Sequence, residues 1–368
     1  MEQLRLVSFL VLIFFSYGAS PVVEGPDVVG IIDALRQSNE ASKVHVLILH
    51  GMGVHEVGES AKLQARLVGK MGSMTKSYCE NAQIPNDPVD LPADLSHAIL
   101  RICEYGNEKG NSIRFYELTW STLTKPVKDR ILQYDDRDYG ASREDVNRKL
   151  KLSVINYGLS DPMLYVGRYQ NVLRFPIKQT ICRIVQRKDN GKSCESNEHS
   201  DEVDQIFIIT QSLGSAMLYD TIREMEAAGS QQEAGAESHD ALTFRSKTRY
   251  IYMLANQLPL LCMSQYSGRE RICEERMGPL VQPGYETNIV AISDPNDLFS
   301  FPLKSWHLDL IGLNGEPTNV LIDIAGSSLI RKLANLADPE KAHTGHADSE
   351  AVISVLACGT ANGKVLEC

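Results

Sequence analysis

The chain of 368 residues lacks the patterns that mark several common functional classes. It has 47 acidic residues against 37 basic ones, so there is no excess of positive charge to bind nucleic acid. No Cys-x-x-Cys pair and no Cys/His cluster has the spacing of a zinc site. The dinucleotide-binding pattern Gly-x-Gly-x-x-Gly is also missing, because Gly51 and Gly53 are followed by Glu56. We therefore expect no nucleic-acid partner, no metal and no cofactor.

Long apolar runs are also scarce, apart from residues 6–17 at the N-terminus. The small residues Gly18, Ala19 and Ser20 follow that run, so we predict a signal peptide over residues 1–20. The run is short for a membrane span of about 20 residues, although an uncleaved anchor remains an alternative. We expect a secreted or periplasmic protein. It would contact a membrane only through a lipid substrate or an uncleaved N-terminal segment.

Eight cysteines follow the apolar run, and an even number in an exported chain predicts disulfides. Many pairings are possible, but neighbouring cysteines are separated by short loops. The local hypothesis therefore pairs Cys79 with Cys103, Cys182 with Cys194, Cys262 with Cys273, and Cys358 with Cys368.

Short apolar runs rich in β-branched residues alternate with helical patterns along the chain. We predict buried strands at 44–49, 113–118, 206–210, 250–254, 288–292 and 319–324, and helices at 60–71, 172–185, 215–228 and 348–357, the last with an Asp348 cap. This alternation predicts an α/β fold with a mostly parallel central sheet flanked by helices.

The stretch from about residue 120 to 192 is longer than a bare α/β unit requires. Its helical spacing predicts an inserted helical region within one domain over residues 21–368. This region would form either a lid or extra helices packed on the core.

A serine corner is the most informative local feature. The apolar strand at 206–210 runs into Ser212 and Gly214, and a helical pattern follows at once. A serine at such a strand–turn–helix corner is held as in the nucleophile elbow Gly-x-Ser-x-Gly, with Thr210 in place of the first glycine. Serine and glycine also occur in such corners for turn geometry alone, so the pattern needs support from other residues.

A glycine-containing loop follows the strand at 44–49 and includes His50, Gly51, Met52 and Gly53. Such a loop can direct backbone N–H groups at the oxyanion formed in acyl transfer, with Met52 and Leu213 as the donors. A phosphate-binding loop is the alternative. We expect His50 and His55 to shape this loop rather than to act as the base.

Acidic and histidine residues in the C-terminal part of the sequence could act together with Ser212. Asp294 and Asp297 follow the strand at 288–292, and we favour Asp297 as the carboxylate that orients a histidine, with Asp294 in reserve. His343 and His346 lie after the last predicted strand, where either could reach Ser212 as a general base.

This chain order, with oxyanion loop, Ser, Asp and His, resembles that of the α/β-hydrolase superfamily. It is most similar to lipase- and esterase-like members with a His-Gly-x-Gly loop. Similar bacterial hydrolases carry stretches like YELTW at 116–120, DPNDL at 294–298 and AHTG at 342–345. The resemblance covers roughly residues 43 to 360 and implies Ser212 as nucleophile, Asp297 as acid and His343 as base. Such relatives often have an aromatic residue at the position of His346.

The resemblance implies a serine hydrolase that cleaves a carboxylic ester of a small molecule or lipid through an acyl-enzyme. Amidase, thioesterase and acyltransferase reactions use the same residues. A catalytically silent binding protein on the same fold is the alternative from another class.

Overall fold

The computed structural model describes residues 20–37, 43–72, 74–84, 97–186, 205–228, 236–263, 288–305, 316–325 and 338–368. The expected signal peptide, except Ser20, lies outside the described residues. Within these ranges, no helix combines the length and the hydropathy that a membrane span requires.

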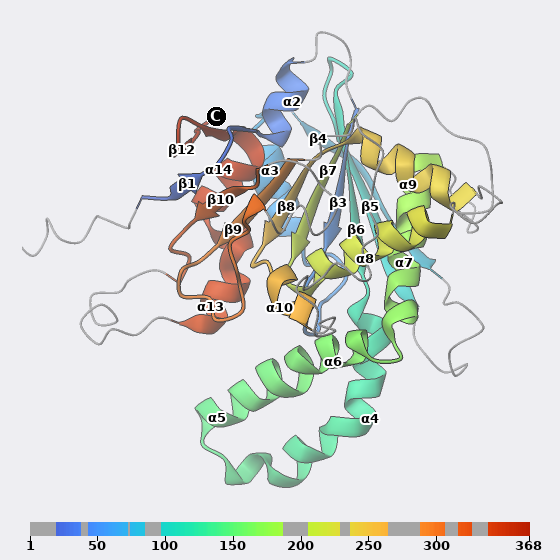
Figure 1. The fold of residues 1–368 in the computed structure, drawn as a ribbon, viewed down its shortest axis with the longest axis vertical. Coiled ribbons are helices and arrows are strands. Elements are labelled where there is room, and N and C mark those ends of the chain that lie inside the picture. The colour runs from blue at the N-terminus through green and yellow to red at the C-terminus, as the bar shows by residue number, and fades with distance from the viewer. Residues whose placement is uncertain are drawn as a thin grey trace, which may run out of the picture.

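A nine-stranded sheet runs through the middle of the protein in the order β1-β10-β9-β8-β7-β3-β6-β5-β4 (Figure 1). The six strands from β10 to β6 are parallel to one another, whereas β1 pairs antiparallel with β10, and β5 pairs antiparallel with both β6 and β4. The bounds are β1 Val22–Glu24, β3 Lys43–Leu49, β4 Thr75–Ile84, β5 Ala98–Gly106, β6 Ser112–Thr119, β7 Gln205–Gln211, β8 Thr248–Leu254, β9 Asn288–Ser293 and β10 Thr318–Leu321. The six predicted strands are therefore confirmed, and they form the parallel part of the sheet.

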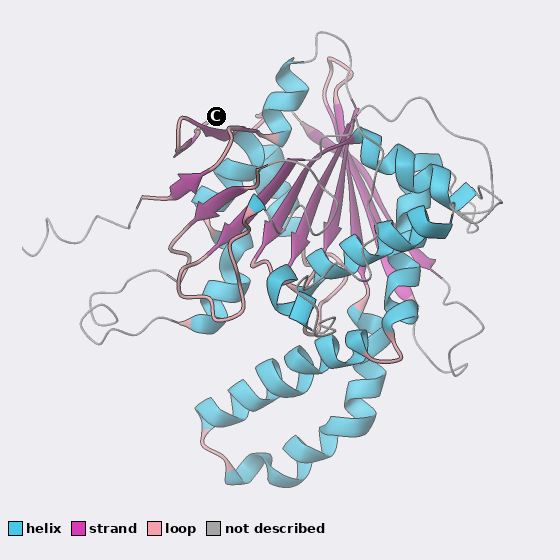
Figure 2. Cartoon of the chain, in the orientation of Figure 1, coloured by secondary structure: helices cyan, strands magenta, loops and turns pink. Residues whose placement is uncertain are grey.

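Helices cover both faces of this sheet, which explains why the parallel strands are mostly apolar (Figure 2). One face packs against α2 (Ile31–Gln37), α3 (Ala61–Gly69) and α14 (Glu350–Cys358). The other face packs against α7 (Gln170–Gln186), α8 (Leu213–Ala228) and α9 (Ala236–Lys247). In β3, Val46 faces the first layer and Leu47 the second, as the alternation of a strand requires.

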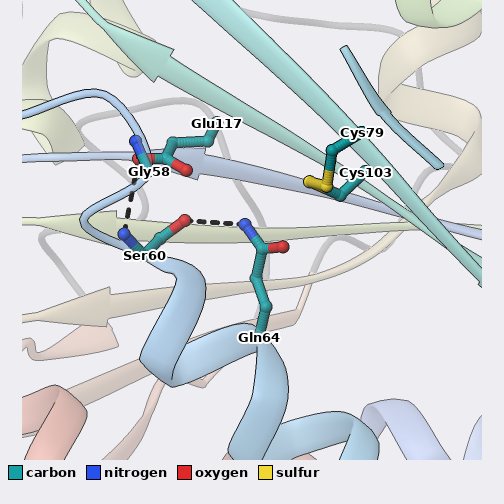
Figure 3. Close-up of a disulfide and its surroundings, with 6 residues drawn as sticks. All are labelled: Gly58, Ser60, Gln64, Cys79, Cys103 and Glu117. Atoms are coloured by element: carbon teal, nitrogen blue, oxygen red, sulfur yellow. Dashed lines mark hydrogen bonds between the residues drawn. A yellow bond between two sulfur atoms is a disulfide. The ribbon is translucent and has the colours of Figure 1, made fainter. Parts of the chain in front are cut away.

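The antiparallel hairpin of β4 and β5 was not predicted. A disulfide joins Cys79 and Cys103, which face each other across the two strands (Figure 3). A second disulfide joins Cys358 at the end of α14 to the C-terminal Cys368. Both expected pairings are confirmed. Cys182 is disulfide-bonded as well, but the partners expected for Cys182 and Cys262 lie outside the described residues.

A helical arm follows β6 and projects beyond the carboxyl ends of the parallel strands (Figure 1). It consists of α4 (Ser121–Tyr139), the 3-10 turn η1 (Gly140–Ser142), α5 (Asp145–Leu150), the π-helical η2 (Lys151–Leu159) and α6 (Ser160–Val166). Ion pairs such as Arg143–Asp135 and Arg148–Asp136 join the two limbs of the arm. The next helix, α7, packs on the sheet instead, so the helices after β6 include both a projecting part and a core-packed part.

The remaining elements are short. They are α10 (Leu258–Cys262) between β8 and β9, α13 (Pro339–Thr344), the 3-10 turn η4 (Gly345–Asp348) and a small sheet in which β11 (Gly359–Ala361) pairs with β2 (Val28–Val29) and β12 (Lys364–Val365). Ser349, not the expected Asp348, caps α14, because its hydroxyl accepts a hydrogen bond from the Val352 N–H.

Candidate active site

Ser212 occupies a strained corner between β7 and α8. Its backbone φ is +52°, in a region that residues other than glycine rarely adopt. The Ser212 N–H donates to the Leu254 carbonyl of β8 at 2.8 Å, which holds the corner against the sheet. A serine in this conformation at a strand-to-helix turn has the geometry of a nucleophile elbow.

Close packing explains which small residues this corner requires. A Cβ on Gly214 would lie 2.7 Å from the His50 carbonyl oxygen, and one on Gly51 would lie 2.7 Å from the Ser212 Cβ. At position 210, where the usual pattern has glycine, the structure accommodates a threonine side chain. Its Oγ1 lies 2.8 Å from the Ser215 Oγ, and this contact joins β7 to α8. The departure of Thr210 from the usual glycine is therefore accommodated by a buried hydrogen bond.

The structure brings Ser212, His343 and Asp297 together in one hydrogen-bonded chain. The His343 Nε2 lies 3.0 Å from the Ser212 Oγ, and its Nδ1 lies 3.0 and 2.9 Å from the two Asp297 carboxylate oxygens. Phe299 packs edge-on against the imidazole, with ring centroids 5.6 Å apart. His343 lies in the last turn of α13 rather than in an open loop, so a helix fixes its position.

The electrostatics of Asp297 favour its ionised form. Burial by itself would raise the pKa of this carboxyl, but the hydrogen bond and the charge of His343 outweigh burial, and the pKa lies below its ordinary value. The Phe299 N–H also donates to Asp297 Oδ1 at 2.9 Å. A carboxylate held in this way can orient the imidazole and stabilise its protonated form.

Asp294, the reserve candidate for the acid, makes a different set of contacts. Its Oδ2 accepts from the N–H groups of Ile324 and Ala325 at 2.6 and 2.7 Å, and its Oδ1 accepts from Asn296 N at 2.7 Å. These bonds join the loop after β9 to the loop after β10. Asp294 is therefore committed to backbone donors, while its neighbour Asp297 faces His343.

His346, the reserve candidate for the base, lies behind His343 and is 1 % exposed. Its Nδ1 is 3.2 Å from the His343 carbonyl oxygen, and no described group is hydrogen-bonded to its Nε2. Burial, reinforced by the charge of His343, lowers the pKa of His346 to about 4. The structure thus gives Ser212 an imidazole partner in His343, and His346 supports the backbone of that residue.

Two backbone amides near Ser212 have no hydrogen-bond acceptor among the described residues. No described group accepts a hydrogen bond from the N–H of Met52 in the loop after β3, or from that of Leu213 at the start of α8. Gly51 brings this loop against the Ser212 Cβ. Donors placed in this way match those that stabilise the tetrahedral intermediate in acyl transfer.

His50 and His55 hold the loop after β3 in shape, as expected. The His50 Nδ1 lies 2.8 Å from the Gly51 carbonyl oxygen, and its Nε2 accepts from the N–H groups of Trp120 and Ser121 at 3.0 and 3.3 Å. The ring stacks on Trp120 and on His55. Burial, followed by the charge of His55, holds the pKa of His50 well below its ordinary value, so the ring stays neutral and can accept.

The continuation of this loop is held by Glu117 at the end of β6 (Figure 3). Its Oε1 accepts from the N–H groups of Gly58 and Ser60 at 2.8 and 3.3 Å. Ser60 in turn accepts from Gln64 of α3. This buried carboxylate therefore sets where α3 begins.

A cavity of about 140 Å³ lies behind the site, on the face covered by α3. Its lining includes Glu117, Gln211 and His346 but neither Ser212 nor His343. Among the described residues, no group of three or more His, Cys, Asp or Glu side chains could hold a metal ion.

Sequence reasoning missed the helical contacts of the oxyanion loop. Lys128 of α4 and Asp161 of α6 form a buried ion pair that reaches Gly53. Their spacing along the chain carries no signal, because single charges in helices of this kind usually face solvent. Trp120 ends the YELTW stretch and Ser121 follows it, and only this position could have pointed to this side of the site.

Comparisons with protein-family models, with curated proteins and with solved structures found no match to this chain. The functional assignment therefore depends on the geometry of the site.

Proposed function

We propose that the chain is a serine hydrolase of the α/β-hydrolase fold that cleaves carboxylic esters through an acyl-enzyme. The observation that carries this proposal is the continuous chain from Ser212 Oγ through His343 to the Asp297 carboxylate. The order of the site along the sequence, with the oxyanion loop first and the histidine last, is that of the α/β-hydrolases. The loop with Met52 and the segments with Ser212, Asp297 and His343 come after β3, β7, β9 and β10. They follow the carboxyl ends of parallel strands, where α/β sheets bind their ligands.

Acylation follows from these contacts. The His343 Nε2 takes the proton as the Ser212 Oγ attacks the ester carbonyl carbon, and the carbonyl oxygen becomes an oxyanion. The N–H groups of Met52 and Leu213 stabilise this charge, and Asp297 stabilises the imidazolium. The imidazolium then gives its proton to the departing alcohol, leaving an acyl ester on Ser212.

Deacylation repeats the same steps with water as the nucleophile. His343 takes a proton from the water as it attacks the acyl carbon, and the same two amides hold the second oxyanion. Ser212 then leaves with the proton from His343, and a carboxylic acid is released. Every step uses groups of this chain and water, so we propose no cofactor.

A fluorophosphonate probe tests the nucleophile directly. We expect the wild-type protein and a Ser246→Ala control, which removes an exposed hydroxyl at the end of α9, to be labelled equally. We expect Ser212→Ala to remain unlabelled with an unchanged melting temperature. Folded wild-type protein that resists the probe would favour the catalytically silent binding protein instead.

The leaving group is tested by substrate panels. p-Nitrophenyl esters of increasing acyl length, with matched amides and thioesters, should show the largest kcat/KM for esters. A higher value for amides or thioesters would redirect the proposal to amidase or thioesterase activity, and acyl transfer to added alcohols would indicate an acyltransferase. The substrate would be a small-molecule or lipid ester.

The proposed location is outside the cytoplasm. The disulfides are typical of proteins from extracellular or periplasmic compartments. N-terminal sequencing of the mature protein should begin near Ser20 if the signal peptide is removed.

A further inference from the structure

Gly53, directly after Met52, is held on both sides of its peptide backbone by one buried ion pair. The Gly53 N–H donates to Asp161 Oδ2 at 2.8 Å, and its carbonyl lies 3.4 Å from the Lys128 Nζ. The ammonium and the carboxylate also contact each other at 2.8 and 2.9 Å. Lys128 belongs to α4 and Asp161 to α6, which lie side by side at the foot of the arm (Figure 1).

Neighbouring contacts come from the same foot of the arm. The hydroxyl of Ser121, the first residue of α4, accepts from the His55 N–H at 3.1 Å and lies 3.3 Å from the His55 carbonyl oxygen. The Trp120 indole donates to the His50 carbonyl at 3.1 Å. The residues before and after Met52 are thus tied to α4 and α6, while the Met52 N–H itself has no described acceptor.

Stability alone does not account for this ion pair. Lys128 and Asp161 are 1 % and 0 % exposed, and burying two charges costs about as much as their attraction returns. Apolar residues of similar volume are often as stabilising in such positions. What an apolar pair cannot do is accept a hydrogen bond from the Gly53 N–H.

We propose that Lys128 and Asp161 are positioning residues: by clamping Gly53 they hold the peptide after Met52, and together with the His50 contact to the Gly51 carbonyl they fix the direction of the Met52 N–H. The inserted helices are then part of the oxyanion-binding apparatus rather than only a cover over it. This inference rests on the proposed function, since it concerns the oxyanion of acyl transfer. Gly53 has a φ of +116°, which other residues rarely adopt, so the peptide after Met52 needs external contacts to stay in place.

Two uncharged double variants separate an effect on the position of the Met52 N–H from an effect on the stability of the fold. Lys128→Met/Asp161→Leu removes the charges and the acceptor for Gly53, whereas Lys128→Met/Asp161→Asn removes the charges but keeps an acceptor oxygen. Arg245→Met/Glu226→Leu removes a second, largely buried ion pair between α9 and α8 and serves as the control. Each protein is measured for its thermal unfolding, for kcat and KM on a p-nitrophenyl ester, and for inhibition by an alkylboronic acid, which forms a tetrahedral adduct with an active serine.

We expect the leucine variant to lose about 10- to 100-fold in kcat, because a small misplacement of a catalytic group has effects of that order. Its KM should stay near the wild-type value, and boronate inhibition should weaken by a factor similar to the loss in kcat. The asparagine variant should recover most of the kcat, and the control should match the wild type.

A folded leucine variant with wild-type kcat would overturn the clamp, as would an equally folded asparagine variant with no recovery. If only the asparagine variant folds, its kcat decides: a loss above about tenfold with an unchanged melting temperature overturns the clamp. Wild-type protein without turnover and without boronate binding would remove the proposed function and the clamp together.

Discussion

The two sides of the candidate site are held in place in different ways. Ser212, Asp297 and His343 follow strands of the central sheet, and the packed core on both faces of that sheet fixes where they meet. The Met52 amide lies on a loop whose neighbours are bound by helices outside the sheet. The sheet and the helix α13 therefore place the proposed nucleophile and base, and the inserted helices contact the loop that carries the proposed oxyanion donor.

This difference shows what a regular scaffold can do by itself. Parallel strands bring their carboxyl ends to one edge, so residues far apart in sequence can meet there, and short contacts such as those of Asp294 then join neighbouring loops. A glycine-containing loop has no such constraint and needs hydrogen bonds from elsewhere. Here those bonds come from a buried ion pair and from the first turn of α4.

The largest expected effect is on ester turnover, and it shows whether Ser212 and His343 act as one unit. Ser212→Ala and His343→Ala should each lower ester turnover by roughly 10⁴- to 10⁶-fold, as removal of a nucleophile or its base does in other serine triads. The double variant should lose no more than either single variant, because one group cannot act without the other. Additive losses in single-turnover measurements would mean that Ser212 and His343 work independently.

The next effect contrasts the two aspartates of one loop. Asp297→Asn should lower kcat by about 10³- to 10⁴-fold with little loss of stability, because the imidazole loses its orienting carboxylate. Asp294→Asn should leave kcat within about tenfold but lower the free energy of unfolding by roughly 1–3 kcal/mol, because buried N–H donors lose their acceptor. Urea unfolding and steady-state kinetics on both variants would reveal an exchange of these roles.

A third effect concerns His346 and the pH dependence of the free energy of unfolding. His346 titrates near pH 4 when folded but near 6.5 when unfolded, so its contribution is present above pH 6.5 and is lost as the pH falls toward 4. The loss should reach roughly 3 kcal/mol. His346→Asn, which can still donate to the His343 carbonyl, should flatten this slope in urea unfolding. A slope equal to that of the wild type would mean that His346 is charged in the native protein.

The smallest effect concerns the link between β7 and α8. Thr210→Val keeps the shape of the side chain but removes its hydrogen bond to Ser215. We expect the free energy of unfolding to fall by about 1 kcal/mol, with kcat nearly unchanged. A large loss of kcat at full stability would instead make Thr210 part of the positioning of Ser212.

The same contrast explains what could be predicted from the sequence. The buried parallel strands carry short, mostly apolar runs, so all six could be predicted, together with the residues just after them. The edge strand β4 is polar and mostly exposed and has no such signal, although the alternation of Ala98, Leu100 and Ile102 in β5 could have been found. Lys128 and Asp161 could not have been found, because nothing local distinguishes a buried charge from a solvated one.

The cross-strand disulfide has a consequence for how the protein must be handled. β4 is the last strand of the sheet, and within the described residues no further strand pairs with its outer backbone groups. An unpaired edge of this kind can serve as a template for other chains. Cys79 and Cys103 attach that strand covalently to β5 and limit its detachment. Production in a reducing cytosol would remove this restraint and should favour aggregates built along the free edge.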